Sequence, residues 1–120
     1  MSESVVIVSG SRDWVDSKFV ISKLEDACCT RVIQGGCPTG VDKIARDWAR
    51  EKGIRCDTYI ANWNRDGKAA GPIRNRRMLY DNKDNPAVTF IAFRLNKSPG
   101  TTSAIKIAKE LKIDSRVYDR

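Results

Sequence analysis

Three glycine-containing segments of this chain each follow a short apolar run and precede a stretch with helical periodicity. They lie at residues 9–12, 35–42 and 98–102. In a parallel α/β sheet, a loop in this position joins the carboxyl end of a strand to the amino end of a helix. The first turn of a helix leaves backbone N–H groups unpaired, and these groups bind anions. The pattern therefore predicts an α/β fold with a site for an anionic, nucleotide-like ligand.

The rest of the chain continues this alternation of strands and helices. Apolar, β-branched runs predict strands at residues 5–8, 31–34, 55–60, 87–93 and 116–118. Apolar periodicity predicts helices at 15–28, from 41 to a C-cap at Gly53, at 72–80 and at 101–111. Asp16 or Ser17 is the expected cap of the first helix, and residues 61–71 are predicted to be a polar loop. We expect one domain over residues 1–120, an α/β fold with a mostly parallel sheet of about five strands and helices on both faces.

The composition argues against several kinds of catalytic and metal site. The chain contains no histidine, which excludes mechanisms that use a histidine base. Its four cysteines form no C-x-x-C motif, so we predict neither a zinc site nor a disulfide framework, and we expect no metal and no cofactor. The first residues lack a basic targeting segment, and no apolar run approaches the roughly 20 residues of a membrane span. We therefore expect a cytoplasmic protein with no membrane partner.

The net charge of +7 fits either an acidic partner or a solvated basic surface. Positive charge gathers in one segment, where Lys68, Arg74, Arg76 and Arg77 follow Trp63. A helix start is an unfavourable place for cations, so Arg74 and Asn75 are interpreted as functional; the alternative is an ordinary solvated helix face.

The candidate ligand-binding residues come from these loops and from this basic segment. They are Gly10, Ser11, Arg12, Gly35, Gly36, Thr39, Gly40, Asp42, Trp63, Lys68, Arg74, Asn75, Ser98, Gly100 and Thr101.

Several of these residues have two interpretations. Asp42 either complements the dipole of its helix or binds a ribose hydroxyl. Trp63 either stacks on a base or covers the edge of the sheet. Thr39 is expected either to cap its helix or to donate to phosphate. Cys37 is interpreted as a small loop residue and not as a nucleophile. The loops match neither G-x-G-x-x-G nor G-x-x-x-x-G-K-[ST], which argues against standard dinucleotide and P-loop sites.

Taken in order, these segments resemble the SLOG superfamily, which groups the SMF/DprA and LOG proteins. The resemblance is strongest to a branch of small stand-alone Rossmann-like domains related to YspA. It rests on residues 10–14, 35–42 and 98–101, and above all on Gly-Lys-Ala-Ala-Gly-Pro-Ile-Arg-Asn at residues 67–75. It implies a Rossmann-like fold that binds nucleotides or nucleotide-derived molecules, often in conflicts between bacteria and phages.

LOG enzymes are phosphoribohydrolases with a Pro-Gly-Gly-x-Gly-Thr loop and a catalytic glutamate shortly after it. Here the matching loop reads Ser98-Pro99-Gly100-Thr101, and Thr102-Ser103-Ala104 stand where an acid would follow. The first hypothesis is therefore a protein that binds, senses or sequesters a nucleotide-derived signalling molecule without chemistry.

Two other hypotheses stay open. One is an N-glycosidic hydrolase that uses Asp13 or Asp42 as its acid. The other is a single-stranded nucleic-acid module, which would bind with strong salt dependence. For any of the three we expect a homo-oligomer, because Trp14 and Trp63 are predicted to be exposed.

Overall fold

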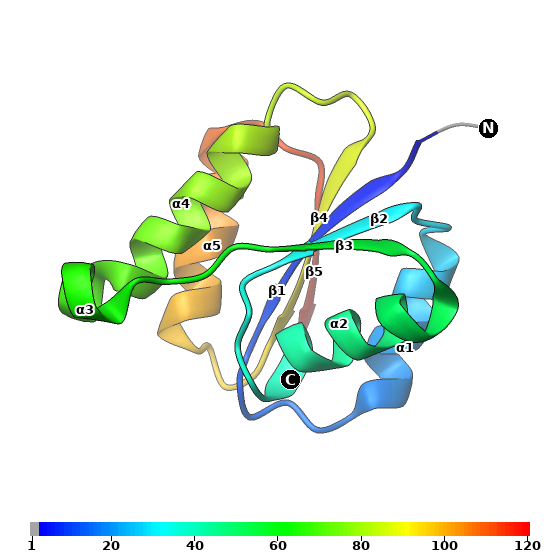
Figure 1. Ribbon diagram of the computed structural model, residues 1–120, viewed down its shortest axis with the longest axis horizontal. Coiled ribbons are helices and arrows are strands. Elements are labelled where there is room, and N and C mark those ends of the chain that lie inside the picture. Colours follow the sequence, from blue (N-terminus) through cyan, green and yellow to red (C-terminus); the bar gives the residue numbers. More distant parts are fainter. Residues whose placement is uncertain (1–2) are drawn as a thin grey trace.

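The computed structural model of the protein describes residues 3–120 and contains a five-stranded, all-parallel sheet (Figure 1). The strand order is β3-β2-β1-β4-β5. The strands are β1 (Val5–Gly10), β2 (Arg31–Gln34), β3 (Arg55–Thr58), β4 (Val88–Arg94) and β5 (Ser115–Asp119). The helices are α1 (Ser17–Asp26), α2 (Gly40–Lys52), α3 (Trp63–Asp66), the 3-10 turn η1 (Gly67–Ala69), α4 (Ala70–Asn82) and α5 (Pro99–Glu110). The predicted Rossmann-like α/β fold is confirmed.

Helices cover both faces of the sheet and create two cores (Figure 1). Val5 and Ile7 of β1 face α4 and α5, whereas Val6 and Val8 face α1 and α2. This alternation follows from the two-residue period of a strand. The central strand is buried on both sides, so its apolar run is continuous. Burying each such side chain contributes about 1.5–3 kcal/mol relative to leaving it in water.

Two of the predicted helix caps are confirmed. The Asp16 carboxylate accepts a hydrogen bond from the Phe19 amide and caps α1. Gly53 ends α2 in the left-handed region, with φ of 68°. Across residues 3–120, none of the helices is both long enough and apolar enough to cross a membrane.

The prediction of a polar loop at residues 61–71 is wrong. The Asn62 side chain accepts a hydrogen bond from the Arg65 amide and starts the short helix α3. Helix α4 then begins at Ala70, so Pro72 falls inside the first turn, where its missing N–H costs no intrahelical bond.

Two other predictions are corrected. Helix α5 begins at Pro99 and not at Thr101, because proline fits the first helical position. Trp14 is buried and not exposed: its ring packs against Phe19 and Phe93. Trp63 is exposed, as predicted.

Candidate functional site

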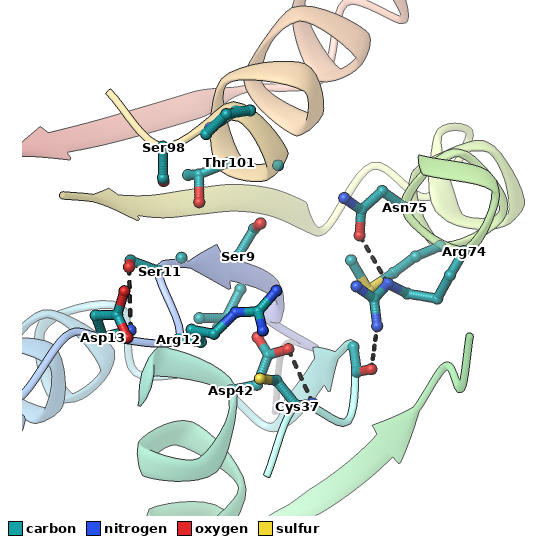
Figure 2. Close-up of a pocket in the computed structure, with 16 residues that line it drawn as sticks. Ser9, Ser11, Arg12, Asp13, Cys37, Asp42, Arg74, Asn75, Ser98 and Thr101 are labelled. Carbon is teal, nitrogen blue, oxygen red and sulfur yellow. Dashed lines mark hydrogen bonds between the residues drawn. The ribbon is translucent and has the colours of Figure 1, made fainter. Parts of the chain in front are cut away.

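A cavity of about 300 Å³ lies at the carboxyl-terminal edge of the sheet, where the loops after β1, β2 and β4 meet helix α4 (Figure 2). A parallel sheet places ligands at this edge. The lining residues are Val8, Ser9, Gly10, Ser11, Arg12, Asp13, Gly35, Cys37, Asp42, Arg74, Asn75, Met78, Ser98, Pro99, Gly100 and Thr101.

Ser11 anchors the loop after β1. Its amide donates to the Phe93 carbonyl at 3.2 Å, and its carbonyl accepts from the Val41 amide at 3.2 Å. The Ser11 hydroxyl accepts from the Asp13 amide at 3.1 Å, which leaves its own hydrogen free to donate. This loop is therefore held at a fixed position between β4 and α2.

The loop after β2 is packed directly on the loop after β1. A Cβ at Gly40, where φ is +73°, would stand 2.2 Å from the Ser11 carbonyl oxygen. Thr39 occupies the N-cap position of α2, but its hydroxyl donates to the Arg12 carbonyl and does not cap the helix. Thr39 and Gly40 therefore join the two loops and do not line the cavity.

Asp42 brings a buried carboxylate to the cavity wall. It lies in the first turn of α2 with 7% of its surface exposed, and its Oδ2 accepts from the Cys37 amide at 3.3 Å. Burial raises the pKa of Asp42 above its ordinary value, while the Cys37 amide and the positive charges of Arg74 and Arg46 oppose that rise. The structure places Asp42 both beside the helix dipole and at the cavity, so the two interpretations of this residue are compatible.

Helix α4 supplies Arg74 and Asn75. The Arg74 guanidinium donates through Nη1 to the Gly35 carbonyl and through Nε to Asn75 Oδ1, the latter at 2.8 Å. Both of these partners are neutral, and the Arg74 guanidinium brings positive charge to the cavity, close enough to Asp42 to oppose the rise in the pKa of that carboxyl (Figure 2).

The start of α5 forms the opposite wall. The first intrahelical bond runs from the Thr102 amide to the Ser98 carbonyl, so the amides of Gly100 and Thr101 have no acceptor in the helix. The Ser98 hydroxyl is inaccessible to solvent and has no hydrogen-bond partner within residues 3–120. This wall therefore offers hydrogen-bond donors.

Eleven of the residues singled out from the sequence line this cavity: Gly10, Ser11, Arg12, Asp13, Gly35, Asp42, Arg74, Asn75, Ser98, Gly100 and Thr101. The structure does not bring Gly36, Thr39, Gly40, Trp63 or Lys68 to the cavity wall. Trp63 lies on α3 with 58% of its surface exposed, and it stands over Gly71.

Sequence reasoning left out Val8, Ser9, Cys37, Met78 and Pro99 as site residues. Ser9 was detectable, because it is the first polar side chain after the apolar run of β1. Met78 reaches the cavity only through the packing of α4, for which the sequence carries no local signal. In the part of the chain from residue 3 onward, no three His, Cys, Asp or Glu side chains gather in a way that would hold a metal ion.

Comparison with known proteins agrees with this architecture. The model of a family described as "YspA, cpYpsA-related SLOG family" matches residues 4–65. The chain is also similar to the Gene 61 protein of Mycobacterium phage D29, with 32% identity and a match that covers 88% of each chain.

Proposed function

Because the chain belongs to the YspA- and cpYpsA-related SLOG family, a nucleotide-related fold, we propose that it binds a nucleotide or a nucleotide-derived signalling molecule in this cavity. Its role would be to sense or sequester that molecule. The similarity to a phage protein supports a setting of conflict between phage and bacterium.

One observation carries the proposal: unpaired donors from the start of α5 and the charge of Arg74 meet at one cavity. The Gly100 and Thr101 amides, the Ser98 hydroxyl and the Arg74 guanidinium come from two separate helices. Such donors bind a phosphate group. The volume of about 300 Å³ lies at the lower end of the range for small-molecule sites.

The test is a retention assay. The protein is incubated with nucleoside mono-, di- and triphosphates, cyclic signalling nucleotides and single-stranded oligonucleotides, and the filtrate is analysed by mass spectrometry before and after heat denaturation. A ligand that leaves the filtrate and returns intact on heating supports binding without chemistry. If only oligonucleotides are retained, and high salt releases them, the proposal is overturned in favour of a nucleic-acid module.

Arg74→Ala is the variant that links binding to this cavity. We expect it to weaken affinity for the retained ligand about 10- to 100-fold, because it removes a charge-assisted hydrogen bond. Arg76→Ala is the matched control, since Arg76 lies on the same helix but outside the cavity. Equal affinities for the Arg74→Ala variant and the unmodified protein would contradict the assignment.

A second candidate function is N-glycosidic hydrolysis of a nucleoside monophosphate. The observation that favours it is the buried Asp42 carboxyl with its raised pKa, because general acids of this kind are tuned by burial. Asp13, the other candidate acid, is exposed at the rim. In the retention assay, hydrolysis would return free base and ribose phosphate, and Asp42→Asn would abolish these products.

A further inference from the structure

We infer that Asp42 makes this cavity selective for a ligand with an intact ribose diol over its deoxyribose counterpart, by accepting hydrogen bonds from the sugar hydroxyls. The inference rests on the proposed function, since it requires a nucleotide in the cavity. It specifies the sugar of that nucleotide.

Hydrogen-bond donors and acceptors are distributed unevenly around the cavity. Thr101 is 3% exposed, and its hydroxyl lies at the cavity beside Ser98 (Figure 2). In Figure 2 these two residues lie across the cavity from Asp42 and Cys37. One wall therefore provides hydroxyls and helix amides, and the facing wall provides a carboxylate with the Arg74 guanidinium near it.

Asp42 is a buried carboxylate with acceptor positions available to a ligand. The side-chain oxygen of Asn75 already accepts from Arg74 Nε. Within residues 3–120, the Asp42 side chain accepts a hydrogen bond from the Cys37 amide at 3.3 Å, and the Gly35 amide makes a weaker contribution. A carboxylate has about four acceptor positions, so Asp42 retains capacity for further donors.

The two walls suit different parts of a nucleotide. A phosphate carries no proton donors at neutral pH and is repelled by a carboxylate, so it belongs at the α5 wall. A ribose diol consists of two adjacent O–H donors, which a carboxylate accepts. The ligand is thereby oriented with its phosphate toward Ser98 and Thr101 and its sugar toward Asp42.

A ligand that lacks a sugar hydroxyl should lose binding affinity at such a position. A site built to hydrogen-bond a ligand hydroxyl discriminates against the analogue that lacks it, because the buried acceptor then loses both water and its partner. We expect ribose ligands to bind about 10- to 100-fold more tightly than their deoxyribose counterparts.

The experiment compares matched pairs of probes by calorimetry: the 5′-monophosphates of adenosine, guanosine, cytidine and uridine, and the corresponding 2′-deoxy compounds. Ribose 5-phosphate and 2-deoxyribose 5-phosphate form a fifth pair that does not depend on the base. The unmodified protein should prefer the ribose member, and Asp42→Asn should reduce this preference to about threefold or less. Asp47→Asn, on the exposed side of the same helix, should keep it.

The outcomes separate the two proposals. Equal binding of ribose and deoxyribose ligands overturns the inference while the proposed function stands. Full preference retained by a folded Asp42→Asn variant also overturns it. If no member of any pair binds, the proposed function fails for mononucleotides, and the inference fails with it.

Discussion

The guanidinium of Arg74 lies directly over Gly35, and it is the size of residue 35 that permits this position. A Cβ at Gly35 would stand 2.7 Å from Arg74 Nη1 and 2.8 Å from Cζ. Its φ does not lie in the left-handed region, so side-chain clearance, and not backbone conformation, requires glycine here. Gly35 thus allows the Arg74 guanidinium to occupy the position from which we propose that it binds the ligand.

Gly35→Ala should therefore weaken binding more than it weakens the fold. The group that must move is the end of a flexible side chain, so we expect the free energy of unfolding to change by less than about 1 kcal/mol. Affinity for the ligand found in the retention assay should fall about 5- to 50-fold, in line with loss of an aligned charged hydrogen bond. Gly71→Ala is the control on α4, where an added Cβ meets only Trp63, at an ordinary 3.6 Å.

Gly40→Ala should destabilise the junction between the first two loops. The new Cβ would meet the Ser11 carbonyl oxygen at 2.2 Å, and φ of +73° adds backbone strain. We expect a loss of about 2–4 kcal/mol in urea denaturation. Gly53→Ala separates the two effects, because φ there is +68° but nothing lies within 4 Å. That variant should lose only about 1 kcal/mol, and equal losses in both variants would contradict the role of loop packing.

Asp42→Asn should stabilise the folded protein at neutral pH and have a smaller effect in acid. Burial raises the pKa of Asp42 in the folded state above 3.8. A raised pKa means that this group stabilises the fold below pH 3.8, and this contribution is lost as the pH rises through the folded-state pKa. Replacing the Asp42 carboxylate by a neutral amide therefore increases the stability of the folded protein most above that pKa. Thermal melts from pH 4 to pH 8 measure the difference, and a gap that widens on acidification would contradict it.

A groove between α4 and α5 should mediate self-association. Its lining includes the exposed apolar side chains Ile73 and Tyr80. Both charge signs are present around them, from Arg76, Arg77, Lys106, Asp81 and Glu110. In a two-fold interface each patch meets its own copy, so mixed signs pair across the axis.

Light scattering coupled to gel filtration should therefore show an oligomer that Tyr80→Asp dissociates. Val15→Asp is the control, because Val15 is an exposed apolar residue outside the groove. A wild-type protein that remains a monomer at its highest soluble concentration would exclude this interface.

Sequence patterns were sufficient to locate the strands and two helix caps, Asp16 and Gly53, whereas most other helix ends differ from the predicted ones by one or two residues. Continuous apolar runs such as residues 5–8 and 87–93 indicated buried parallel strands, and Gly53 marked a helix end through its left-handed conformation. The region from 61 to 69 was missed because α3 is held by one Asn62 cap and is only one turn long. So short a helix has almost no apolar periodicity to detect.

The same reasoning placed eleven residues at the cavity but misjudged others. Gly36, Thr39 and Gly40 share their segment with cavity-lining Gly35. Packing assigns them other roles, because Gly36 lies against Thr58 at the end of β3, whereas Thr39 and Gly40 contact the loop of Ser11 and Arg12. Trp14 stands in a loop between Asp13 and Val15, yet contacts with Phe19 and Phe93 bury it. The contact with Phe93 joins segments that are distant in the chain and leaves no trace in the local sequence.

The position of β1 in the sheet also constrains when the protein can fold during translation. β1 pairs with β2 on one side, Val5 beside Arg31, and with β4 on the other, Val5 beside Val88. A nascent chain that has emerged only as far as β3 would expose Ile7 and Ile33 to water, because the residues that cover them come later. Loop closure over such a distance is slow, and unpaired strand edges invite aggregation. Ribosomal synthesis must therefore pass β4 before stable folding begins, and a translational pause before that point should lower the yield of native protein.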